Sequence, residues 1–231
     1  MNKPVVDYRE FRLSKLNTPQ FAHMKLPIFG WLFYFSFYFL TENLIPAEIC
    51  HPIHCALDDV IPFCEYFAVF YVFWYFLVFG SLLYGLFYDI EWLTRLSKFI
   101  LITQVVAMTV YILYPSRQDL RPEVFVRDNA LTRLMAFIYS FDTSTGVFPS
   151  LHVAYSMGIL SVALKKKELP GGWKWLLGVL VLCICLATAF VKQHSVLDIL
   201  AALPVSLLAE GLVYWGDYWK PRLSAKRKQT A

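Results

Sequence analysis

The sequence predicts an all-α membrane protein, a polytopic bundle of six transmembrane helices. The chain of 231 residues is 58% hydrophobic and only 16% charged, whereas soluble domains are nearer half apolar and a quarter charged. The apolar residues also gather in runs of about 20, the length that crosses a hydrocarbon layer roughly 30 Å thick. Because these runs fill most of the chain, we expect residues 1–231 to form one membrane-embedded domain.

The six runs are apolar on all sides and longer than strands, as membrane-spanning helices are. Aromatic residues such as Trp173 and Trp215 lie near predicted helix ends, as in the belts at a membrane surface. The polar, basic segment before the first run is not expected to be a cleavable signal peptide. The predicted helices are Pro27–Ile45, Tyr66–Tyr88, Ser97–Tyr114, Val147–Leu164, Gly171–Val191 and His194–Trp215.

The basic residues predict the orientation. With the N-terminus inside, most of the 21 lysines and arginines fall in inner segments, including Lys3, Arg95, Lys165 to Lys167 and the tail from Lys220 to Lys228. The positive-inside rule then makes this a multi-pass cell membrane protein with both termini cytoplasmic. The net charge of +4 needs no nucleic-acid partner to explain it.

Three short polar segments interrupt the apolar pattern. They run from Tyr114 to Pro122, from Phe148 to His152, and from Phe190 to Asp198. In the predicted topology the third helix ends outside, and the fourth and sixth helices begin outside. All three segments therefore meet the same outer face, where we expect the functional site.

His194 and Asp198 are four residues apart at the start of the predicted sixth helix, so they share a face. A carboxylate bonded to one imidazole nitrogen fixes the tautomer and leaves the other nitrogen free as a base or nucleophile. An acid within a membrane segment is also costly, which favours a function. The alternative is an interfacial histidine beside a solvated aspartate.

His152 follows Pro149, a residue favoured in the first turn of a helix. Ser150 and nearby backbone amides at that helix start favour anion binding, and Arg121 and Lys192 add positive charge on the same face. Each of these residues alone also fits an ordinary interface or a solvated loop. Together they are the parts needed for phosphoryl transfer through a phosphohistidine without a metal or other cofactor.

These motifs resemble the type-2 phosphatidic acid phosphatase superfamily. The match comprises Arg121-Pro122, then Pro149-Ser150 with His152, then His194 with Asp198, in the family's order and spacing and within residues 114–198. The sequence departs from the pattern at Tyr114, at Leu151, and at Ala187-Thr188, where the family has lysine, glycine and Ser-Arg. Lys192 is similar to a variant in the inositolphosphotransferase-like branch.

The resemblance implies a mechanism and a substrate class. His194 would attack phosphorus, Asp198 would orient it, and His152 would protonate the leaving alkoxide. Arg121, Ser150 and Lys192 would bind the phosphoryl oxygens. The expected function is hydrolysis of a phosphomonoester or diphosphate lipid, such as phosphatidate or a polyprenyl diphosphate. The alternatives are a lipid phosphotransferase with an alcohol acceptor and a non-catalytic lipid binder or transporter.

The first outer loop holds further polar residues. The spacing from Cys50 to Cys55 fits no common zinc pattern, so no metal site is predicted there, and a disulfide among Cys50, Cys55 and Cys64 stays open. The acidic residues of this region are expected to be solvated, and Asp142 to cap a helix or line the pocket floor. The acidic residues are Glu42, Glu48, Asp58, Asp59 and Glu65.

Overall fold

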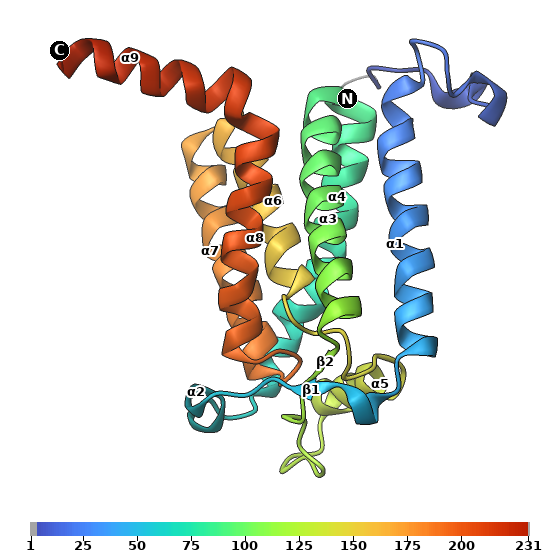
Figure 1. Cartoon of the computed structure of the whole chain (residues 1–231), viewed down its shortest axis with the longest axis vertical. Helices are drawn as coiled ribbons and strands as arrows, with labels where there is room; N and C mark the ends of the chain where they lie inside the picture. The colour runs from blue at the N-terminus through green and yellow to red at the C-terminus, as the bar shows by residue number, and fades with distance from the viewer. Residues whose placement is uncertain (1–3, 231) are drawn as a thin grey trace.

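Six helices form a bundle, close to the positions that the sequence predicts (Figure 1). The computed structural model describes residues 4–230, with side chains described as far as residue 225. The prediction of an all-α protein is confirmed. The bundle helices are α1 (Lys25–Leu44), α3 (Ala68–Tyr88), α4 (Ile90–Leu113), α6 (Leu151–Lys165), α7 (Gly171–Phe190) and α8 (Val196–Tyr214).

Within the described residues, four helical segments are long and apolar enough to cross a membrane: Glu65–Tyr88, Ile90–Leu113, Gly171–Phe190 and Val196–Ala225. The prediction of six spans is therefore confirmed for four helices only. Helix α6 has 15 residues, which is short for a bilayer crossing. Helix α1 has 20 residues, but its tyrosine, tryptophan, serine and threonine residues reduce its mean hydropathy.

Five of the six predicted helix starts differ from the structure, those of α1, α3 and α8 by two residues each, and caps explain the starts of α4, α6 and α8. Helix α4 begins at Ile90 rather than Ser97, because the Asp89 carboxylate accepts a hydrogen bond from the Trp92 amide at 3.0 Å. Helix α6 begins after Ser150, which is its N-cap, so Pro149 lies outside the first turn. Helix α8 begins at Val196, which leaves His194 in the preceding loop.

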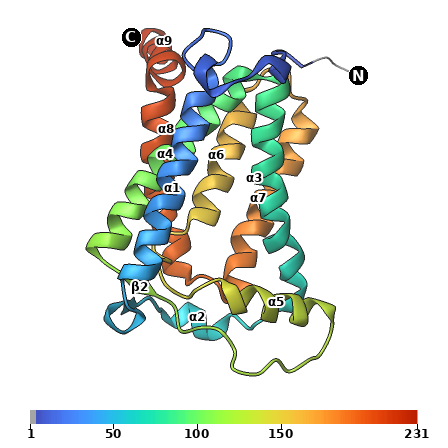
Figure 2. The same ribbon diagram turned by 90° about the vertical axis from the view of Figure 1, so that its right-hand side faces the viewer.

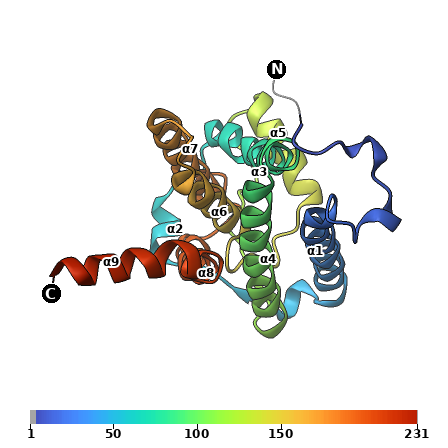
Figure 3. The same cartoon turned by 90° about the horizontal axis from the view of Figure 1, so that it is seen from above.

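Helix α4 lies at the centre of the bundle and packs against α1, α3, α6 and α8 (Figure 3). Its side chains Leu96, Phe99 and Met108 are almost completely buried. Large apolar side chains such as Phe76 and Leu207 are instead exposed on the outside of the bundle. Water would penalise so much exposed apolar surface, whereas lipid would not.

The two ends of the bundle differ (Figures 1 and 2). One end carries both described chain ends and helix α9 (Lys220–Thr230), which runs sideways from the bundle after a π-helical turn at Trp215–Trp219. Of the basic residues that predict the orientation, Lys3 lies outside the described residues, and so do the side chains of Lys226, Arg227 and Lys228.

The opposite end is covered by short elements that the sequence did not predict. They are α2 (Ala56–Val60), α5 (Ala130–Phe141) and two short parallel strands, β1 (His51–Pro52) and β2 (Ser116–Arg117). Helix α5 is capped by Asn129 and packs Met135 and Ile138 against residues of α3 and α7. Its single apolar face was too short to stand out among the long apolar runs.

Replacing Gly85 with alanine is expected to destabilise the α3–α4 hairpin. A Cβ atom at Gly85 would lie 2.8 Å from the backbone nitrogen of Leu93, and a backbone atom cannot move aside as a flexible side chain can. We expect a loss of about 1–3 kcal/mol, measured by thermal unfolding in detergent. Gly80→Ala is the control, because a Cβ atom at Gly80 would have no neighbour within 4 Å. Equal unfolding temperatures for the two variants would contradict the prediction.

Candidate active site

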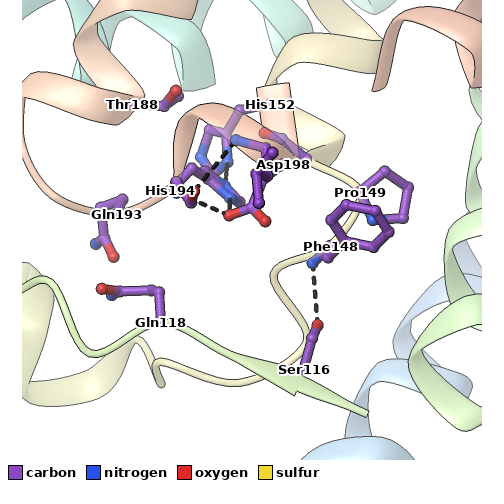
Figure 4. A network of polar contacts seen from close by, with 12 residues as sticks. Ser116, Gln118, Phe148, Pro149, His152, Thr188, Gln193, His194 and Asp198 are labelled. Carbon is purple, nitrogen blue, oxygen red and sulfur yellow. Dashed lines mark hydrogen bonds and ion pairs between the residues drawn. The ribbon is translucent and has the colours of Figure 1, made fainter. Parts of the chain in front are cut away.

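The three polar segments predicted to meet do meet, at the end of the bundle opposite the chain termini (Figures 1 and 4). The Phe148 amide donates to the Ser116 hydroxyl at 3.1 Å, which joins the start of α6 to β2. The Ser150 amide donates to the Asp198 carbonyl at 3.1 Å, which joins α6 to α8. These bonds between segments distant in the chain give the site a defined geometry.

A chain of three side chains forms the centre of the site (Figure 4). His194 Nδ1 lies 3.2 Å from Asp198 Oδ2, and His194 Nε2 lies 3.3 Å from His152 Nδ1. Asp198 is completely buried and His194 is only 7% exposed. The structure therefore brings together His152, His194 and Asp198, the three residues predicted to be catalytic.

The order of contacts suggests one arrangement of protons. A carboxylate only accepts, so His194 donates through Nδ1–H, and its Nε2 is then an acceptor. His152 in turn donates through Nδ1–H, which leaves its own Nε2 without a proton. In this arrangement His194 Nε2 carries no proton, as a nucleophile requires, and its lone pair accepts the Nδ1–H of His152 until a substrate takes that place.

The Asp198 contact has a different local origin from the one predicted. His194 precedes the helix, and Asp198 is the third residue of α8. The Asp198 carboxylate turns back to accept the Ser195 amide at 2.9 Å, as in a capping box. That same turn brings it to His194, so the pair forms at a helix start rather than along one helix face.

Aromatic rings surround His152. The ring centroids of Trp74 and Tyr71 lie 4.1 and 4.8 Å from that of His152. Trp74 Nε1 also donates to the His152 carbonyl at 3.0 Å. His152 Nε2 is buried and has no hydrogen-bond partner among the described residues, so a group brought in by a ligand would find an open acceptor there.

Lys192 has a structural role in place of the predicted contact with phosphate. Its backbone has φ of 53°, a left-handed conformation that is unusual for a residue other than glycine. Its ammonium donates to the carbonyls of Asp58 at 2.7 Å and Ile61 at 2.5 Å. Burial lowers the pKa of this ammonium, and the nearby carboxylates of Asp58 and Asp59 partly offset the effect. Lys192 thus fastens the His194 loop to the segment around α2.

The expectation that the first outer loop is fully solvated was wrong for Asp58 and Glu65, which are both buried. Asp58 accepts hydrogen bonds from the Ser195 hydroxyl at 2.5 Å and from the Val196 amide at 2.8 Å. Burial alone would raise the pKa of Asp58, but these donors and those of Cys55 hold it below its ordinary value. A distant carboxylate therefore caps α8 directly beside His194.

Replacing Asp58 with asparagine is expected to weaken both the fold and the site. The amide offers one acceptor where the carboxylate serves three donors from Cys55, Ser195 and Val196. An unsatisfied buried donor costs about 1–3 kcal/mol, and His194 would lose its fixed position. Thermal unfolding in detergent and turnover should both fall. Asp59→Asn is the matched control, because Asp59 is exposed and its side chain bonds only to His54 among the residues that the structure describes. Identical behaviour of the two variants would refute this role.

Arg121 extends to the site, but most of its N–H groups donate hydrogen bonds to other groups of the protein. Its guanidinium donates to the carbonyls of Asp142 at 2.8 Å and Thr143 at 2.9 Å, and to the Gln193 side chain at 2.6 Å. It also stacks on Tyr139, 4.6 Å from the ring centroid. Its Nε is buried without a partner in the described part of the chain. Arg121 therefore links the end of α5 to the His194 loop and keeps one donor free.

Ser150 caps α6, with its hydroxyl accepting the Val153 amide at 3.4 Å. Its side chain is completely buried, so its contribution to an anion site would come through the helix start that it stabilises. Two amide side chains that the sequence did not single out, Gln193 and Gln118, face each other beside His194 (Figure 4). Gln118 Nε2 is a buried donor with no partner among residues 4–230.

A cavity of about 1000 Å³ extends from the histidine pair into the bundle. His152, His194 and Asp142 line one end, and Met24 and Leu86 line the other. Helices α1 and α3 supply most of its walls, which are largely apolar and aromatic. A long apolar chain would fit between these walls while its polar end lies at His194.

All five cysteines are free thiols, so the structure forms no disulfide among Cys50, Cys55 and Cys64. In the described part of the chain, no group of three or more histidine, cysteine, aspartate or glutamate side chains is placed to hold a metal ion. His51 instead stacks on Tyr114, with 4.5 Å between ring centroids. The Cys50–Cys55 segment therefore packs against the end of α4.

Comparison with protein-family models, curated proteins and solved structures gives no match to this chain.

Proposed function

We propose that this protein is a membrane lipid phosphatase that forms a phosphohistidine at His194. The observation that carries the proposal is the buried chain from Asp198 through His194 to His152 at one end of a large apolar cavity. An oriented imidazole supplies a nucleophile, and an apolar cavity suits a lipid chain. The resemblance of the three motifs to type-2 phosphatidic acid phosphatases points to the same chemistry.

In the first step, His194 Nε2 attacks phosphorus and the bond from phosphorus to the lipid oxygen breaks. His152 enters this step as imidazolium, after taking up a proton with the anionic substrate. It gives one proton to the departing alkoxide and becomes neutral. Asp198 stabilises the positive charge that develops on His194. The products of this step are the phosphohistidine and the lipid alcohol, or the phosphohistidine and the lipid monophosphate when the substrate is a lipid diphosphate.

In the second step, neutral His152 takes a proton from water. The resulting hydroxide attacks phosphorus, the bond from phosphorus to His194 Nε2 breaks, and inorganic phosphate leaves. We assign the phosphoryl oxygens to Arg121 Nε, Gln118 Nε2 and the start of α6, because these donors have no other partner among the described residues or lie at a helix N-terminus. The assignment leaves out Lys192, whose ammonium is bound to two carbonyls.

The proposal includes an arrangement in the membrane. All six bundle helices would cross or enter the bilayer, with both termini cytoplasmic and the histidine pair near the outer face. The positive-inside bias of the sequence and the position of both described chain ends at one end of the bundle (Figure 2) support this arrangement.

Phosphate release by the detergent-purified protein tests the proposal. Phosphatidate and a polyprenyl diphosphate are supplied with a chelator present, with and without an alcohol acceptor. We expect inorganic phosphate from at least one lipid, with no effect of the chelator. Formation of a new phosphodiester in place of phosphate, only with the alcohol present, would identify a phosphotransferase. Neither product from either lipid would contradict a catalytic function.

A further inference from the structure

Two carboxylates near the histidine end of the cavity, one on its lining and one behind it, have no role in the proposed chemistry. Asp142 lines the cavity and accepts a hydrogen bond from Gln193 at 3.1 Å. Glu42 lies behind Thr145, whose hydroxyl donates to it at 3.2 Å. The second oxygen of Glu42 is buried and has no partner among the described residues. Two acids next to a phosphate site would repel an anionic substrate unless a cation lies between them.

The basic side chains in the described part of the chain neutralise Asp142 only in part. Among the residues whose side chains are described, no ion pair includes Asp142 or Glu42. Arg121 is the nearest candidate, but it binds the backbone carbonyls of Asp142 and Thr143 rather than a carboxylate. Burial raises the pKa of Asp142, and the charges of Arg121 and His194 offset this only in part.

Aromatic side chains face the cavity from both walls near these acids. Tyr34 and Tyr38 come from α1, and Tyr71 and Tyr75 come from α3. All four line the same cavity as Asp142, and the Tyr71 hydroxyl donates to the Asp142 carboxylate at 3.5 Å. Aromatic faces attract cations, and a set of such faces with a nearby acid is how proteins bind quaternary ammonium groups.

We propose that this end of the cavity binds an ammonium group carried by the substrate, as in a zwitterionic phospholipid headgroup with a choline or ethanolamine amine. The inference rests on the proposed function, because it places the ammonium beside the phosphoryl group at His194. With such a phosphodiester the bond to the lipid oxygen breaks as in the first step, and the phosphoryl group on His194 keeps its amino alcohol. Water then releases phosphocholine or phosphoethanolamine in place of inorganic phosphate. Asp142 and Glu42 supply the negative charge, and the tyrosines supply the cage. A polyol headgroup would also find acceptors at the two acids but would gain little from four aromatic faces.

Binding of a matched pair of ligands tests the inference. The first is dodecylphosphocholine, and the second is its isostere in which a tert-butyl group replaces the trimethylammonium group. The full chain carrying His194→Ala is used in lipid nanodiscs, so that turnover does not interfere. We expect the choline ligand to bind about tenfold more tightly than the isostere. Adding Asp142→Asn and Glu42→Gln should bring the ratio of affinities close to one.

The isostere is an internal control for folding, because its affinity should survive both substitutions. Asp59→Asn, an exposed acid on the same end of the bundle, should leave the ratio unchanged. Equal affinities in the parent chain, or a preference that persists in the double variant, would overturn the inference. So would tighter binding of a dodecyl phosphoinositol. The binding measurement needs no turnover, so its result is independent of phosphate release. The ammonium site could be refuted while phosphatidate is still hydrolysed, and it could be supported while no phosphate is released.

Discussion

Replacing His194 with alanine is expected to abolish phosphate release from a lipid substrate, with a loss on the order of a thousandfold or more. The variant lacks the only nucleophile in the proposed scheme, in which His152 serves as the acid and then as the base. Phosphate release by purified wild type and variant, at equal protein concentration, measures the effect. A wild-type phosphohistidine trapped after rapid acid-free quenching should be absent from the variant.

His54→Ala is the matched control for this variant. His54 is an exposed histidine at the same end of the bundle, and its only side-chain partner among the described residues is Asp59. It should retain wild-type activity. Membrane insertion and thermal unfolding of His194→Ala should also remain close to wild type, because the imidazole makes only two side-chain hydrogen bonds within the described part of the chain. Substantial activity in a folded His194→Ala protein would exclude the phosphohistidine mechanism and favour a non-catalytic lipid binder or transporter.

Asp198→Asn is expected to lower turnover by about a hundredfold to ten-thousandfold, with a smaller change in substrate affinity. The neutral amide would no longer stabilise the positive charge on His194 in the transition state. Its NH₂ group would also compete for Nδ1 and so favour the tautomer that carries a proton on Nε2. The kinetic constants kcat and KM, measured separately, distinguish this effect from a loss of binding.

Glu210→Gln provides the contrast for Asp198→Asn. Glu210 lies in the same helix, α8, at the other end of the bundle, where it pairs with Lys165 at 2.6 Å. The substitution removes an ion pair whose side chains are only 12% and 16% exposed. Thermal stability should therefore fall, while the turnover of the folded fraction stays near wild type. If both variants lost stability and activity in the same proportion, Asp198 would be a structural residue rather than one that orients His194.

The sequence by itself determined the helical bundle and the end of the bundle at which the three polar segments meet. Long apolar runs are a local property, and in membrane-spanning lengths they leave helix as the structure that satisfies the backbone. The spacing of His194 and Asp198 also brought the two side chains within reach, although through a helix cap rather than along one helix face. His152 was predicted to lie in the first turn of a helix, and the helix that begins after Ser150 places it there.

Tertiary structure decided which polar residues reach the site. The direction of Lys192 depends on a left-handed backbone and on carbonyls more than 130 residues away in the chain. The burial of Asp58 depends on Ser195, which is just as distant. The sequence predicts neither contact, because the local sequence around a charged loop residue does not distinguish a solvated side chain from one that binds a distant part of the chain. Long-range packing therefore directs Lys192, predicted to bind phosphate, to two backbone carbonyls. It also makes Asp58, predicted to be solvated, the cap of α8.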